Sequence, residues 1–190
     1  MDIRILEIKV LVEQILRVLG IPTTVSTQDT PERVAKMYVN ELFSSLAPGA
    51  LEDLKGRMTC FPNEGRGLII IKGITFNSIC EHHLMPFSGV VNVGYMPNDK
   101  IIGLSKIPRV VKFFSRKPQL QERYTKEIAE FLMDTLNSIF LTVTVKATHA
   151  CVMCRGAESD CQTITVYTLG DREGEKLFAE RGGFDFADKI

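Results

Sequence analysis

This sequence lacks most of the compositional biases that indicate a class of function. Lys plus Arg and Asp plus Glu both number 23 among 190 residues, so the formal net charge is zero. Nucleic-acid-binding proteins usually carry a basic excess, so no nucleic-acid partner is expected. No internal repeat or low-complexity segment is present, and a hydrophobic content of 45% is typical of one folded globular protein.

Long uninterrupted apolar runs are also missing. Charged residues interrupt the first segment, MDIRILEIKVLVEQILRVLG, which therefore differs from the apolar centre of a signal peptide. No later stretch reaches the length and apolarity of a membrane span. The five cysteines do not show the spacing of a disulfide framework. We therefore expect no membrane contact, and cysteines that are free or metal-bound in the reducing cytoplasm.

Apolar periodicity predicts four main helices. The first covers residues 5–19 and ends before Gly20, and the second has Thr30 as its N-cap and Pro31 in its first turn. A third helix begins at Ser105 and a fourth follows Pro118. Between the second and third helices, residues 48–67 contain Pro and Gly and are expected to form a loop.

Strands are predicted where β-branched residues dominate, at residues 68–76, 88–96, 141–151 and 162–170. The resulting order is two helices followed by β-β-α-α-β-β. This order predicts an α+β fold with a largely antiparallel sheet and helices on one face. It also divides the chain into an N-terminal helical region, 1–66, and an α+β domain, 67–190.

Histidine is scarce, and its placement is the main indication of chemistry. The three histidines all lie in CEHHLMPF (80–87) and THACVMCRG (148–156), together with three of the five cysteines. Thiolate and imidazole are the preferred ligands of zinc, and a catalytic zinc typically has three protein ligands and one open position. Cys80 and His83 have a spacing that one turn can wrap around a metal, and Cys151 would be the distant third ligand.

A single Cys or His is more often a buried packing residue than a metal ligand. The sequence also leaves undecided what fills the fourth coordination position of the metal. His149 and Cys151 are two residues apart and would face the same side of an extended strand. His82 and His149 would then remain as acids or bases. Cys154 offers an alternative, because a fourth thiolate would give a closed structural zinc site, and spacing alone does not exclude it.

Several polar residues could bind an anionic purine nucleotide, although such residues are usually solvated surface. Lys106 lies at a helix start, where backbone amides favour an anion. The adjacent Gln121 and Glu122 could contact the polar edge of a purine-like ring. The other basic candidates are Arg109, Arg155, and Arg33 with Lys36, which share one helical face.

Five ordered motifs resemble the GTP cyclohydrolase I family: DTPERVAKMY, CEHHLMPF, IIGLSKIPRVV, PQLQERYTKEIA and THACVMCRG. The similarity covers residues from about 29 to 170. It implies the tunnelling fold, in which sheets from several subunits join into a barrel. It also implies a homo-oligomer, a decamer of two pentamers, with active sites at subunit boundaries.

The resemblance assigns a role to each candidate residue. The zinc ligands are Cys80, His83 and Cys151, and the catalytic residues are His82, His149 and Ser105. The guanine contacts are Gln121 and Glu122, and the triphosphate contacts are Lys106, Arg109, Arg155, Arg33 and Lys36. The implied reaction converts GTP and water into 7,8-dihydroneopterin triphosphate and formate, the first step of pterin and tetrahydrofolate biosynthesis.

Two other functions remain to be weighed against this one. A related tunnelling-fold enzyme, such as the nitrile reductase of queuosine synthesis, would need a nucleophilic cysteine and a nicotinamide site in place of metal ligands. A non-catalytic assembly protein would hold a closed structural zinc that includes Cys154. The sequence also departs from the family pattern at Val152 and Cys154 and in a short segment, AESDCQ (157–162).

Overall fold

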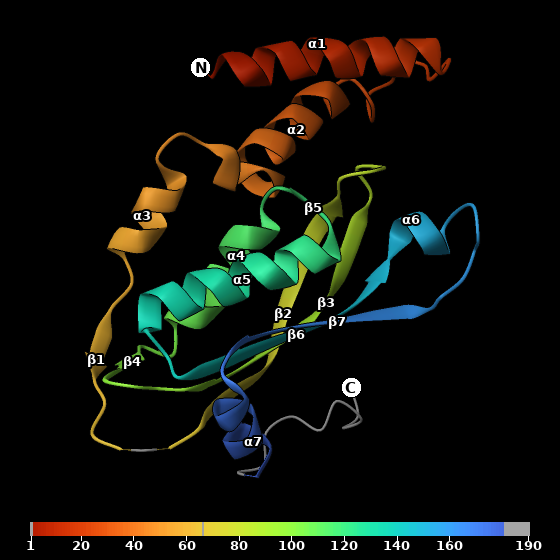
Figure 1. Ribbon diagram of the computed structural model, residues 1–190. Helices are drawn as coiled ribbons and strands as arrows, with labels where there is room; N and C mark the ends of the chain where they lie inside the picture. The colour runs from red at the N-terminus through yellow and green to blue at the C-terminus, as the bar shows by residue number, and fades with distance from the viewer. Residues whose placement is uncertain (1, 66, 181–190) are drawn as a thin grey trace.

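Four long strands form the centre of the computed structural model, which describes residues 2–65 and 67–180 (Figure 1). They are β2 (Ile69–Cys80), β3 (Pro86–Met96), β6 (Phe140–His149) and β7 (Gln162–Gly170). The sheet order is β5-β2-β3-β6-β7, in which the short β5 (Pro118–Gln119) pairs parallel to β2 and the other pairs are antiparallel. The predicted α+β class and β-β-α-α-β-β order are confirmed.

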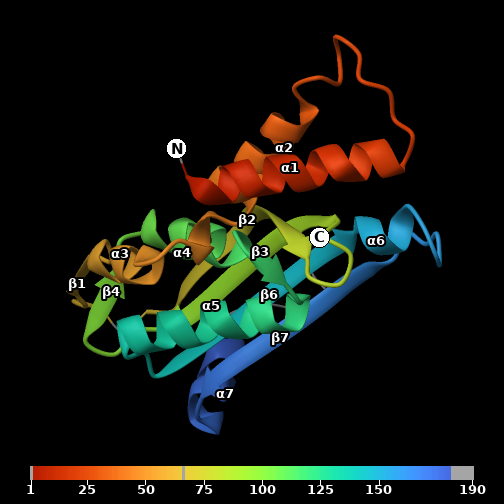
Figure 2. The same cartoon turned by 90° about the horizontal axis from the view of Figure 1, so that it is seen from above.

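Two helices cover one face of this sheet. They are α4 (Lys106–Ser115) and α5 (Gln121–Leu136), which lie side by side across the strands (Figures 1 and 2). Their apolar faces meet alternate residues of β3, as the periodicity predicts. The fully buried members of this core include Val91, Val93, Tyr95, Val110, Val111, Tyr124, Ile128 and Leu132.

The region expected to be a loop, residues 48–67, contains two elements, so that prediction was wrong. They are α3 (Ala50–Gly56) and β1 (Cys60–Pro62), which pairs with β4 (Lys100–Ile102). Both are too short to show a periodic pattern, and tertiary contacts stabilise them. Leu54 of α3, for example, is 7% exposed and belongs to the main core.

The N-terminal helices are α1 (Ile3–Val18) and α2 (Thr30–Met37), which pack together at one end of the molecule (Figure 1). The N-cap of α2 is Asp29, one residue before the predicted Thr30. A π-helical turn (Tyr38–Leu42) and a 3-10 turn (Ser44–Leu46) follow. The division of the chain into regions 1–66 and 67–190 stays a prediction. Residues 1, 66 and 181–190 of these regions lie outside the part of the chain that the structure describes.

The last described element, α7 (Arg172–Glu180), packs Phe178 against Phe140 of β6 in a small second core. In the described residues, no helix combines the length and apolarity needed to cross a bilayer.

Candidate metal centre and active site

The first dense motif forms the turn between β2 and β3. Cys80 is the last residue of β2, and its N–H donates to the carbonyl of Met85 (2.8 Å). The Leu84 N–H donates to the carbonyl of Cys80 (2.9 Å), and Leu84 adopts a left-handed conformation (φ 51°). The chain therefore closes a tight turn that carries Cys80 and His83 together.

The second dense motif ends β6. The strand stops at His149, and residues Ala150–Met153 form the short helix α6. The expectation of an extended strand through Cys151 was therefore wrong, because the chain turns helical one residue earlier. Pairing of Phe87 in β3 with His149 in β6 still brings α6 next to the β2–β3 turn.

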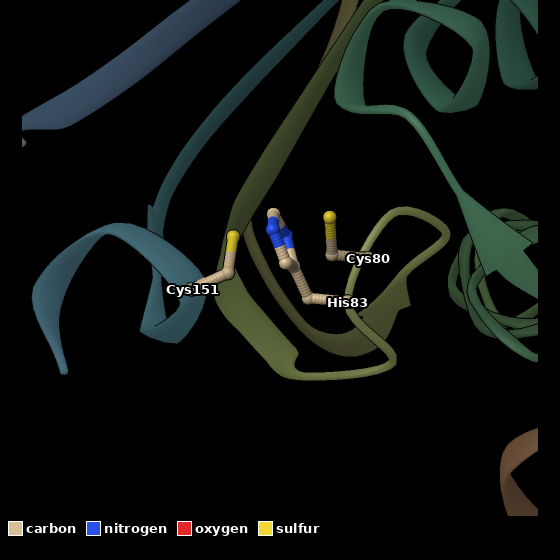
Figure 3. Close-up of side chains that lie close together, drawn as sticks. All are labelled: Cys80, His83 and Cys151. Carbon is tan, nitrogen blue, oxygen red and sulfur yellow. The ribbon is translucent and has the colours of Figure 1, made fainter. Parts of the chain in front are cut away.

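Together these elements assemble a group of three metal-binding side chains. The ligand atoms of Cys80, His83 and Cys151 all lie within 4.8 Å of one another. Figure 3 shows the two thiols and the imidazole pointing toward a common point between the turn and α6. Cys80 is buried, Cys151 is half-buried and His83 is exposed, so the group opens to solvent on one side.

Cys154 lies outside this group. It follows α6 as the C-cap residue and is exposed. All five cysteines are free thiols. Three ligands with one solvent-facing side suit an open metal site better than the closed four-ligand alternative.

The surroundings of Cys151 affect the acidity of its thiol. Burial raises the pKa of the Cys151 thiol, and its contact with the Cys80 thiol raises that pKa further, while the charge of Arg155 acts in the opposite direction. Ionisation of Cys151 is therefore unfavourable unless a cation lies close to its sulfur. A divalent metal would supply that charge and favour both thiolates.

His149 ends β6 just before the start of α6, and two side chains hold its imidazole ring: one packs on a ring face and the other contacts a ring nitrogen. Its ring stacks on Phe87 with centroids 4.6 Å apart and planes 2° from parallel. Its Nε2 lies 2.8 Å from Oε1 of Gln121. Burial lowers the pKa of His149, and the negative charge of Glu122 partly opposes that effect.

His82 lies in the β2–β3 turn, next to Cys80. Its Nδ1 is 4.0 Å from the Cys80 sulfur, and its ring is exposed. Both predicted catalytic histidines therefore neighbour the three metal-binding side chains.

The predicted guanine contacts begin α5. Gln121 is 2% exposed, whereas Glu122 is exposed in the first turn of the helix. A carboxylate in a first helical turn is favoured by the unpaired backbone N–H groups.

The predicted phosphate contacts are more dispersed. Arg155 follows α6 and is close enough to Cys151 to influence its pKa. Ser105 and Lys106 start α4, and Arg109 lines a cavity of about 370 Å³ to which none of the three metal-binding residues contributes. That cavity is rich in cations, with Arg57, Lys112 and Arg116 beside Arg109.

Arg33 and Lys36 lie on α2 and pair with acidic residues of their own helix region. The Arg33 guanidinium is 3.2 Å from Asp29, and the Lys36 ammonium is 2.6 Å from Glu32. Within one chain, the predicted metal ligands and catalytic histidines thus lie close together, whereas several of the predicted phosphate contacts lie elsewhere.

Sequence reasoning missed two supporting side chains. Phe87 stacks on His149, and only the strand register between β3 and β6 could have indicated that contact. Arg123 donates hydrogen bonds to the carboxylate of Glu81 and to the carbonyl of Pro118, so α5 anchors the metal-binding turn. The adjacency of Arg123 to Gln121 and Glu122 in the sequence was the available signal.

Comparison with known proteins identifies the family. The sequence profile of GTP cyclohydrolase I matches residues 8–181, nearly the whole chain. The chain belongs to the GTP cyclohydrolase I family. A GTP cyclohydrolase 1 of Clostridium perfringens (strain 13 / Type A) is 44% identical over 143 residues, covering 75% of this chain and 75% of the relative. That of Vibrio cholerae serotype O1 is 42% identical over 160 residues, covering 83% of this chain and 72% of the relative.

Among solved structures, an archaeosine synthase QueF-Like in the apo form is similar, with a TM-score of 0.49 and 18% identity. The match covers 57% of this chain and 98% of the other. Membership of the GTP cyclohydrolase I family thus rests on the sequence matches.

Proposed function

We propose that this chain is a zinc-dependent GTP cyclohydrolase I, which hydrolyses GTP to 7,8-dihydroneopterin triphosphate and formate in pterin and tetrahydrofolate biosynthesis. The observation that carries the proposal is the convergence of Cys80, His83 and Cys151, with His149 beside them. A structural-zinc protein would not need a charged carboxylate and two histidines around an open metal site.

The donor set fits zinc. Two thiolates and one imidazole are ligands that zinc prefers, and three protein ligands leave one coordination position for catalysis. When bound, the ion would supply a Lewis acid and lower the pKa of a water molecule toward neutrality.

The protein's own residues would bind the base and move protons. The carboxylate of Glu122 would accept the N–H groups of guanine in charge-assisted hydrogen bonds. His149, which burial keeps largely neutral near pH 7, would exchange a proton with the imidazole nitrogen of the purine. His82 would assist opening of the ribose ring, and Ser105 would act in the later rearrangement.

Lys106, Arg109, Arg155, Arg33 and Lys36 would bind the triphosphate. Since Arg109 lines a cavity away from the metal group of its own chain, we propose that some of these cations act in the site of a neighbouring subunit. This arrangement requires a homo-oligomer, for which we propose a decamer of two pentamers in the cytoplasm.

An activity assay tests the proposal. Purified protein loaded with zinc and incubated with GTP should release formate and give a product that becomes fluorescent after oxidation to a pterin. Treatment with a chelator should abolish the activity, and added Zn²⁺ should restore it. A folded, zinc-loaded protein that yields neither product would support the structural-zinc alternative.

Glu122→Gln tests the guanine assignment. The substitution keeps the shape of the side chain but removes its charge, so kcat/KM for GTP should fall about 100-fold, as expected for a charged hydrogen-bond acceptor. The matched control is Glu130→Gln, because Glu130 is exposed on the same helix and pairs only loosely with Lys126 (3.7 Å). Near-normal activity of Glu122→Gln would remove Glu122 from the site.

A further inference from the structure

Every polar atom of the Gln121 side chain is engaged within the chain itself. Its Nε2 lies 3.1 Å from the carbonyl of Val145 and 2.9 Å from the carbonyl of Thr163. The Thr165 hydroxyl is 3.3 Å from the same nitrogen. Its Oε1 lies 2.8 Å from Nε2 of His149. With 2% of the residue exposed, Gln121 has little surface with which to contact a substrate.

The two carbonyl groups settle which way the Gln121 amide points. Carbonyl oxygens only accept hydrogen bonds, so the amide atom that faces Val145 and Thr163 must be the NH₂ group. Exchanging nitrogen and oxygen would place three acceptors together in a buried position, which is unfavourable. The Oε1 atom therefore faces His149 and accepts a hydrogen bond from it.

This orientation determines the proton position on His149. A neutral imidazole carries one N–H, and Oε1 of Gln121 requires that N–H at Nε2. Nδ1 is then the unprotonated nitrogen and is left for chemistry. A 180° flip of the ring would place the carbon Cε1, instead of Nε2, against Oε1 of Gln121, and the parallel contact with Phe87 opposes that rotation.

We propose that Gln121 is a positioning residue that fixes the tautomer and ring orientation of His149. The inference rests on the proposed function in one respect, namely that His149 transfers a proton. It gives the adjacent residues Gln121 and Glu122 separate tasks: the buried amide orients the histidine, and the exposed carboxylate binds the base.

The first test measures the tautomer directly. Zinc-loaded protein containing ¹⁵N-labelled histidine would be studied by long-range ¹H–¹⁵N NMR at about pH 8.5, above the usual pKa of histidine. With three histidines in the chain, His149→Asn identifies the signals of His149. We expect Nε2–H in the wild type. A dominant Nδ1–H form would overturn the proposal, and this holds even if Gln121 variants do not fold.

The second test compares Gln121→Met with Thr165→Val. Methionine has a similar length but no acceptor, so His149 should lose its single tautomer. Valine at position 165 removes the hydroxyl near Nε2 but leaves both carbonyl partners and Oε1 in place, so the tautomer should remain. A single, unchanged Nε2–H tautomer in folded Gln121→Met would overturn the proposal.

Steady-state kinetics separate positioning from guanine binding. In Gln121→Met we expect kcat to fall about 10- to 100-fold, the range typical of residues that orient a reacting group, with KM for GTP within about threefold of normal. An unchanged kcat, with or without a higher KM, would overturn the proposal. If the wild type makes no pterin product at all, the proposed function fails, while the NMR result still decides whether Gln121 sets the tautomer.

Discussion

Cys154 and Cys151 are separated by one turn of chain, yet the structure gives them different surroundings. Cys151 contributes a thiol to the group with Cys80 and His83, whereas Cys154 is exposed. Cys154→Ser should therefore keep one zinc per chain and most of the activity. Cys151→Ser should lose both, because it removes one of three ligands. Metal content by atomic emission spectroscopy and the GTP assay give the two readouts.

The contrary result would be equally clear. If folded Cys154→Ser loses its zinc, the site has four protein ligands and no open position, and the catalytic reading fails. Circular dichroism of each variant distinguishes loss of metal from loss of fold.

The buried Tyr124 should make the stability of the folded chain fall at alkaline pH. Its side chain is fully buried under the sheet, and its hydroxyl donates to the carbonyl of Val111 (3.0 Å). Burial raises the pKa of Tyr124 well above its ordinary value. Below about pH 10 both folded and unfolded chains keep the proton. Above that pH the unfolded chain releases it and the folded chain does not, so stability falls as pH rises.

Tyr124→Phe should show both effects. At pH 7 the variant should be less stable by about 1 kcal/mol, because the hydrogen bond from the hydroxyl to the Val111 carbonyl is lost. Between pH 10 and 11 its stability should fall less steeply, by up to about 1.4 kcal/mol per pH unit, since one linked proton is absent. Urea unfolding at one protein concentration measures both quantities, and parallel pH dependences of variant and wild type would contradict the assignment.

At the scale of single residues, the sequence indicated which side chains belong to the site better than it indicated which side chains contact one another. The ligands Cys80, His83 and Cys151 could be proposed because thiols and imidazoles are rare and were clustered. The contact between Gln121 and His149 could not be, since it depends on how the start of α5 meets the end of β6. Side-chain partners across elements follow from tertiary packing, which spacing along the chain does not encode.

At the scale of elements, Gly89 sets how closely β3 approaches β6 next to the site. A Cβ atom at Gly89 would lie 1.8 Å from the carbonyl oxygen of Lys146 and 2.7 Å from the Cα of Ala147. Both are backbone atoms and cannot move aside without displacing the strand. Gly89→Ala should therefore cost about 3 kcal/mol of stability, as overpacking does, and should lower activity by disturbing the Phe87–His149 pair.

Gly56→Ala is the matched control for Gly89→Ala. No atom lies within 4 Å of a Cβ built at Gly56, and its φ is not positive. The control should unfold within about 1 kcal/mol of the wild type, because alanine is favoured over glycine in a helix. Thermal unfolding of the three proteins compares them, and equal stabilities of the two variants would mean that β3 and β6 separate without cost.

Long elements with a clear period were predictable, and short ones were not. The strand 162–170 was predicted with the observed bounds, because its residues alternate over nine positions. The helix α6 spans four residues, fewer than a periodic pattern needs, so the sequence was read as continued strand. The same reason applies to α3 and β1, whose stability comes from contacts with the core.

At the scale of the whole molecule, much apolar surface is left uncovered by the single chain. No residue of α1 is buried, and its exposed apolar residues include Val18 at 81% and Leu11 and Ile15 at 56% each. On β7, an edge strand of the sheet, Ile164 and Val166 are 47% and 45% exposed. Large exposed apolar patches and open strand edges usually mark contact surfaces between chains.

We therefore expect the protein to form a large ring assembly. Size-exclusion chromatography with light scattering should give a mass many times the 21.3 kDa of one chain. The double substitution Ile164→Lys and Val166→Lys places two charges on the exposed face of β7. It should reduce both the mass and the activity, because the proposed active site draws its phosphate-binding cations from a neighbouring subunit. A stable monomer with normal GTP turnover would contradict this, since one chain would then have to bring Arg109 to its own metal group, and the two lie at separate places in the fold.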